Sequence, residues 1–126
     1  MALGLSPVSG VDLLTDWGTT YRYFKLHTGD PGSAGTSNPA SNTTRVQADW
    51  GTPDSSTPGV VTMTHTDALA WTSVPASEDY THVSIWDAST AGVFGGSGLI
   101  TADAVTIGNN FTLPIGAVTV TQPVAG

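Results

Sequence analysis

Two segments decide the fold of this chain: FKLHTGDPG at residues 24–32 and YTHVSIWDA at residues 80–88. Each contains alternating apolar and polar residues, the period-two pattern of a β-strand in a sheet. The first segment ends in Gly-Asp-Pro-Gly at residues 29–32, which is turn chemistry because Pro fixes φ and Gly permits a positive φ. The pair therefore predicts two strands of a mainly β fold, with Val83 and Ile85 of the second strand facing the core.

Short patterns of the same kind recur along the chain to residue 121. The stretch 45–51, for example, predicts a strand with Val46, Ala48 and Trp50 on one face. About seven or eight short strands at this spacing predict a single antiparallel β-sandwich or flattened barrel. A length of 126 residues suits one domain. We expect an N-terminal arm with a short helix at 1–20, a β-core at 21–121 and a loose tail at 122–126.

The only helix that the sequence predicts lies in the first twenty residues. Ser9 and Asp12 are spaced as in a capping box, and Gly18 stands where a helix C-cap would lie. Such a short helix is marginal alone in water, so it must dock on the β-core or on a neighbour. Its apolar face is also a candidate for partner contact and consists of Val8, Val11, Leu14 and Trp17.

A long polar loop at residues 29–43 is our first candidate for a partner-contacting arm. It is rich in Gly, Ser, Asn and Pro and has few side chains to bury. Loops of more than about 12–15 residues in compact domains are usually functional or disordered. We expect this loop to become ordered on contact with a partner through Asp30, Pro31, Asn38 and Pro39.

The composition excludes several classes of partner. Charged residues are 10% of the chain, and ten acidic side chains oppose three basic ones, for a formal net charge of −7. Binding to nucleic acid requires Lys and Arg to displace phosphate counterions, and three cations cannot supply that surface. Anionic membranes are excluded for the same reason. The chain has no cysteine, so disulfides, thiolate nucleophiles and cysteine-bound zinc are excluded as well.

No motif for catalysis or for a cofactor is present in the sequence. His27, His65 and His82 have none of the spacings of a metal site, and no acidic segment matches a calcium loop. The Gly-x-Ser-x-Gly motif of serine hydrolases is also missing. Glu78 and Asp79 are a pair of carboxylates, but in a turn before a strand they are weak evidence for glycoside hydrolysis. We therefore expect no enzyme activity, no cofactor and no bound metal.

The order of these features resembles one family. A short helix, Leu-His-Thr-Gly-Asp-Pro-Gly at residues 26–32, a polar loop and Thr-His-Val-Ser-Ile-Trp-Asp-Ala at residues 81–88 are similar to small virion structural proteins of actinobacterial phages, such as mycobacteriophages. Members of this family are often labelled tail fibre or minor tail proteins, and some decorate heads. The resemblance covers nearly the whole chain and implies a virion structural protein without catalytic residues.

We expect capsid decoration as the main function, in which the chain lies on the capsid surface and reinforces it without covalent bonds. Its partners would then be the major capsid protein and copies of itself, and we hypothesise a trimer. The alternative is a tail fibre or minor tail protein that binds a glycan receptor. That alternative requires exposed aromatic faces, for which the candidates are Trp17, Trp50, Trp71, Trp86, Tyr21, Tyr23 and Tyr80.

Overall fold

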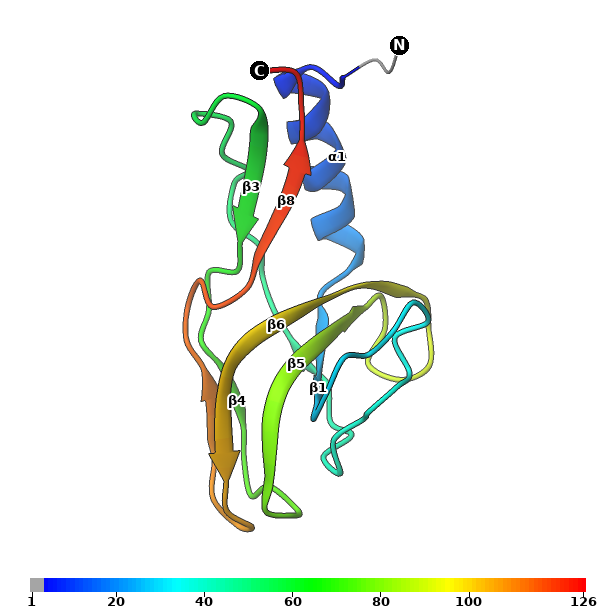
Figure 1. The fold of residues 1–126 in the computed structure, drawn as a ribbon, viewed down its shortest axis with the longest axis vertical. Coiled ribbons are helices and arrows are strands. Elements are labelled where there is room, and N and C mark those ends of the chain that lie inside the picture. The colour runs from blue at the N-terminus through cyan, green and yellow to red at the C-terminus, as the bar shows by residue number, and fades with distance from the viewer. Residues whose placement is uncertain (1–3) are drawn as a thin grey trace.

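One helix and eight strands form the part of the chain that the computed structural model describes, residues 4–126 (Figure 1). In chain order they are α1 (Pro7–Thr20), β1 (Tyr23–His27), β2 (Val46–Gln47), β3 (Val60–Thr64), β4 (Leu69–Trp71), β5 (Glu78–Trp86), β6 (Phe94–Val105), β7 (Phe111–Leu113) and β8 (Thr119–Pro123). All strand pairs are antiparallel. The predicted mainly β fold with an N-terminal helix is confirmed.

The strands form three sheets. The largest has the order β2-β1-β5-β6, and two-stranded ladders pair β3 with β8 and β4 with β7. None of the three closes on itself within residues 4–126, so the expected layers are small open sheets and not a closed barrel. Figure 1 shows α1 beside β3 and β8 at one end of the molecule, with β4, β5 and most of β6 at the other. We call these the helix end and the sheet end.

The two segments that decide the fold are paired in the structure. β1 and β5 lie side by side in a register that places Phe24 opposite Ile85 and Leu26 opposite Val83. All four of these side chains are buried, which confirms the prediction for Val83 and Ile85. The other face of β5 is covered too, because the Phe94 ring packs against Trp86. A strand buried on both faces has to satisfy its inward polar groups within the protein.

A chain of hydrogen bonds gives the buried polar groups of His27, Ser84 and Trp86 their partners. His27 Nδ1 lies 2.9 Å from the carbonyl oxygen of Ser37, which only accepts, so Nδ1 carries the proton. His27 Nε2 then accepts from the Ser84 hydroxyl at 2.7 Å. The Ser84 oxygen in turn accepts from the Trp86 indole N–H at 2.7 Å. These contacts tie β1, β5 and the loop at 29–43 together.

Both ends of the helix differ from the prediction. The N-cap is Ser6, whose hydroxyl accepts from the backbone N–H of Ser9 at 3.1 Å, and Pro7 follows as the first helical residue. Pro suits this position because its fixed φ is helical and its missing N–H is not needed there. Gly18 does not end the helix but lies buried inside it, where a Cβ would approach Met63 within 3.0 Å. The glycine therefore serves close packing, and the helix continues to Thr20.

Two further boundaries also have to be corrected. Only Val46–Gln47 of the predicted strand at 45–51 belongs to the large sheet, because the chain then leaves the sheet end. Trp50 forms an isolated bridge with His65 next to β3. The last residues are not a loose tail, since β8 extends to Pro123 and the N–H groups of Val124 and Ala125 donate to the carbonyls of Gly59 and Leu5.

The hydrophobic core has two parts. The larger cluster fills the sheet end around β1, β4, β5 and β7. The smaller one lies under α1 and consists of Leu14, Val61 and Met63. Trp17 and Trp50 are half-buried and pack against both clusters, so the two rings join the helix end to the sheet end.

Replacing Ser84 by Ala should destabilise the protein strongly. The change leaves the Trp86 N–H and His27 Nε2 buried without partners, and each orphaned group costs about 1–3 kcal/mol. We expect a loss of about 2–4 kcal/mol in the free energy of unfolding, measured by urea titration. Ser97→Ala is the matched control, because Ser97 lies opposite Ser84 in β6 and is exposed. Equal losses in both variants would contradict the role given to Ser84.

His27 should make the stability depend on pH. Burial lowers the pKa of His27 below the ordinary histidine value of 6.5, so the unfolded chain takes up a proton first as the pH falls. The contribution is therefore complete above about pH 6.5 and is lost as the pH decreases below it, by up to about 1.4 kcal/mol per pH unit. His27→Gln keeps a donor and an acceptor but does not titrate. Urea titrations between about pH 7 and about pH 5 should give a flatter profile for this variant than for the wild type.

Candidate functional site

The predicted contact face of α1 is turned mostly toward the protein itself. Leu14 is buried in the smaller core cluster, and Val11 packs partly against it. Trp17 is half-buried, and its indole N–H donates to the carbonyl of Gly95 at 3.3 Å. Val8 alone of the four is freely accessible, at 71% exposed. The helical spacing correctly places these residues on one face of α1. In a helix that packs on its own protein, however, the apolar face is buried against the core and is not available to a partner.

The loop at 29–43 has a defined structure of its own. Asp30 caps its first turn, because one carboxylate oxygen accepts from the N–H of Gly32 at 2.9 Å. The Asn38 side chain donates back to the carbonyl of Asp30 at 3.0 Å, which closes the loop. Asp30, Asn38 and Pro39 are exposed, whereas Pro31 is fully buried. Three of the four predicted loop residues are therefore accessible to a partner, and Pro31 is not.

Packing on the sheet end also holds this loop. Gly35 has a φ of 75° and lies so close to the Phe94 ring that a Cβ would approach it within 2.4 Å. Nearby, the Arg45 guanidinium lies 4.4 Å from the centroid of the Trp86 ring. Arg45 Nη1 donates to the carbonyls of Ala88 and Ala91 at 2.9 and 2.7 Å. The expected ordering on contact is thus not needed for the loop to hold its shape.

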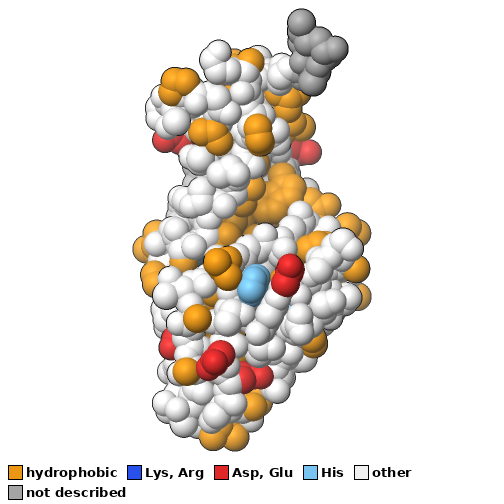
Figure 2. All heavy atoms as spheres, in the orientation of Figure 1, with side chains coloured by type: hydrophobic (Ala, Val, Ile, Leu, Met, Phe, Trp, Pro, Cys, Tyr) orange, Lys and Arg blue, Asp and Glu red, His pale blue; other side chains and the backbone are white. Residues whose placement is uncertain are grey.

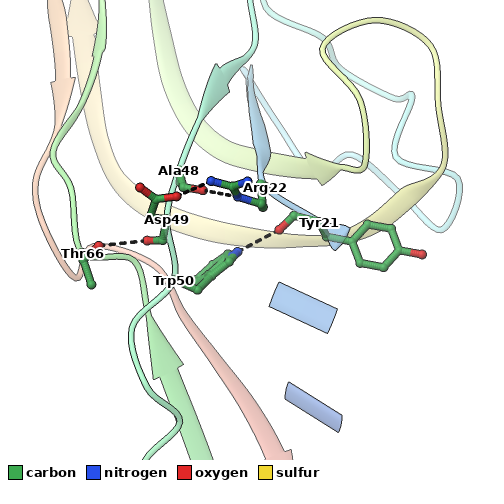
Figure 3. A network of polar contacts seen from close by, with 6 residues as sticks. All are labelled: Tyr21, Arg22, Ala48, Asp49, Trp50 and Thr66. Atoms are coloured by element: carbon green, nitrogen blue, oxygen red, sulfur yellow. Dashed lines mark hydrogen bonds and ion pairs between the residues drawn. The ribbon is translucent and has the colours of Figure 1, made fainter. Parts of the chain in front are cut away.

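A polar network marks the waist, by which we mean the region between the helix end and the sheet end (Figure 3). The Arg22 guanidinium pairs with one carboxylate oxygen of Asp49, and its Nε donates to the carbonyl of Ala48 at 3.2 Å. The Trp50 indole N–H donates to the carbonyl of Tyr21 at 2.8 Å. These contacts join the end of α1 to the segment that follows β2.

A pocket of about 540 Å³ opens beside this network, and we call it the waist pocket. It is lined by Thr15, Gly18 and Thr19 of α1, by Arg22, by residues 49–53 and by Met63. Sequence reasoning did not single out Arg22 or Asp49, because the two lie 27 positions apart and only the folded chain brings them together. The one signal was the alternation at 45–51, which placed Asp49 and Trp50 on opposite faces of a strand.

The aromatic candidates for ligand contact divide into two groups. Trp71 and Tyr80 are buried in the larger core cluster, and Trp86 is buried against Phe94 and Arg45, so none of the three presents a ring to a ligand. The other four, Trp17, Trp50, Tyr21 and Tyr23, remain half-buried. Trp17 and Trp50 lie at the waist, 5.4 Å apart between ring centroids. Figure 2 shows hydrophobic side chains gathered at the narrow middle of the molecule, and no lysine or arginine shows on that face.

Lys25 is partly buried, and the His65 imidazole is hydrogen-bonded within the fold. Burial lowers the pKa of Lys25, and the neighbouring Arg45 charge lowers it further. His65 Nδ1 lies 2.8 Å from the carbonyl of Asp67, while its Nε2 accepts from the N–H of Val118. No group of three or more metal-binding side chains occurs within residues 4–126. In the same residues no helix has both the length and the apolar character to cross a bilayer.

Comparison with known proteins gives one family. The family model described as podophage GP4 fiber I protein gp80 matches residues 18–121, which is most of the chain. No curated protein matches the sequence. The expected phage virion protein is confirmed at this level, and the match favours the fibre alternative over capsid decoration. The chain therefore belongs to the podophage GP4 fiber I protein gp80 family, a family of phage fibre proteins, and is a structural protein of the virion.

Proposed function

We propose that this chain is a non-catalytic component of a tail fibre or minor tail structure, where it contacts other virion proteins and a host receptor. The family match over residues 18–121 carries this proposal, because it names a fibre protein and covers both ends of the fold. Capsid decoration would also make the chain a structural protein of the virion, but no family match supports it.

The contacts with the virion are proposed for two surfaces. At the helix end, Leu5, Val8 and Leu13 are large apolar side chains that remain exposed. The loop at 29–43 presents Asp30, Asn38 and Pro39. Few charges lie on these surfaces, so docking removes little charge from water. Their partners in this proposal are neighbouring fibre proteins and copies of the same chain, and the trimer hypothesis is kept.

The absence of catalysis is also part of the proposal. Nδ1 of both His27 and His65 lies within hydrogen-bond distance of a backbone carbonyl, and Nε2 of each accepts from a donor. Their imidazoles are therefore engaged in holding the fold. His82 Nδ1 lies 2.8 Å from the hydroxyl of its neighbour Thr81. A structural role for the whole chain agrees with these partners.

Gold labelling of an epitope-tagged copy on intact virions tests the location. The tag follows Gly126, and the labelled particles are viewed by electron microscopy. We expect label on the tail or on its fibres. Label spread over the head would overturn the fibre proposal and restore capsid decoration.

Val8→Asp should reduce incorporation of the protein into virions by tenfold or more, an effect of about 1.4 kcal/mol. Val8 is 71% exposed, and an acidic residue in the first turn of a helix is favourable, so the isolated protein should keep its stability. Incorporation is measured by immunoblot of purified particles. Leu99→Asp is the matched control, because Leu99 is 72% exposed in β6, outside both proposed contact surfaces. An equal decrease in both variants, or in neither, would contradict contact through the helix end.

A further inference from the structure

We propose that the waist pocket binds a neutral saccharide, with the Trp50 indole as the apolar wall and the Arg22–Asp49 pair as the polar recognition element. This inference rests on the proposed fibre function, to which it adds the receptor class and the site. Three properties of the pocket support it: its shape, the orientation of its polar groups and its charge.

The shape of the pocket suits a small ligand. Its volume of about 540 Å³ lies within the range of about 300–1,000 Å³ that is typical of small-molecule sites. Gly18 and Gly51 contribute no side chains to the lining. The Trp50 indole borders this space, and an aromatic ring packs well against the C–H groups of a sugar.

The ring and the ion pair are held in place before any ligand arrives. Trp50 is fixed by its hydrogen bond to the carbonyl of Tyr21 and by packing against Trp17 and Phe24, at 5.4 and 5.5 Å between ring centroids. The Arg22 side chain is fixed by its bond to the carbonyl of Ala48. Preorganisation of this kind reduces the entropy lost on binding.

The ion pair leaves hydrogen-bonding groups available on both sides. Arg22 uses Nε and Nη2, and Asp49 uses Oδ1. Within residues 4–126 no hydrogen bond engages Nη1 of Arg22 or Oδ2 of Asp49. The two side chains are 34% and 61% exposed. A donor and an acceptor side by side match two neighbouring sugar hydroxyls, of which one accepts and the other donates.

The charge of the site favours an uncharged ligand. Arg22 and Asp49 neutralise each other, and the rest of the pocket lining carries no ionisable side chain. An acidic sugar or a phosphate would face the net charge of −7 with only an already paired guanidinium to receive it. The Thr15 and Thr19 hydroxyls donate to the carbonyls of Val11 and Asp16 at 2.8 and 2.7 Å, and their oxygens keep lone pairs that can accept from a sugar hydroxyl.

The test uses neutral oligosaccharides released from the surface polysaccharide of the bacterium that the phage infects. They are titrated into the nitrogen-15-labelled full-length protein, and the shift of the Trp50 indole N–H signal is followed by NMR. We expect saturable shifts of this signal. Asp49→Asn should weaken binding about tenfold or more, since one charge-assisted hydrogen bond is worth at least that factor.

Two further variants keep the test decisive. Thr19→Trp fills the pocket from α1 without changing the ion pair and should abolish binding. Asp103→Asn changes the same charge at the sheet end and should bind like the wild type. Loss of binding in all three variants, or in none, would place the saccharide elsewhere. No shift in the wild type would overturn the saccharide site and leave the fibre assignment untouched, because gold labelling tests that assignment separately.

Discussion

The Ser84 hydroxyl is the contact on which the sheet end depends, because it serves two buried partners at once. It donates to His27 and accepts from Trp86, so one oxygen satisfies a side chain from β1 and another from β5. His27 in turn donates from Nδ1 to the carbonyl of Ser37, which lies in the loop at 29–43. Buried polar groups without partners are costly, and this chain of contacts removes that cost at the centre of the largest sheet. These bonds hold the Trp86 ring and the loop in place, and Phe94 packs against Trp86.

The features that the sequence predicted well depend on local chemistry. Alternation in the β1 and β5 segments identified the two central strands, and Gly-Asp-Pro-Gly placed the turn after His27. The sequence predicts the helix correctly but not its cap: Ser9 fits the capping pattern, whereas Ser6, another hydroxyl residue three positions earlier, is the N-cap. The prediction that Gly18 ends the helix is wrong because sequence spacing does not reveal the Met63 side chain against which Gly18 packs.

The candidate site could not be predicted, for a related reason. Leu14 and Pro31 looked available to a partner because apolar helix faces and proline-rich loops often are, yet both are used within the protein. The Arg22–Asp49 pair requires the chain to leave the large sheet after β2 and to cross to the helix end. That crossing is a long-range property of the topology. The only local feature that reflects it is the short length of β2, two residues. The waist is thus where the structure adds most to the sequence.

The hydrogen bond from Ala125 to Leu5 has a mechanical consequence for a fibre component. It brings the two terminal segments to the same pole of the molecule, beside each other at the helix end (Figure 1). Tension that pulls these segments apart would load the hydrogen bond between Ala125 and Leu5 first, and then the bonds of the β3–β8 ladder in turn. Tension along the long axis, from the helix end to the turns of the sheet end, would load the β1–β5 ladder in shear, with its bonds sharing the force. The fold is therefore mechanically anisotropic, and its resistance depends on the direction in which a neighbour is attached.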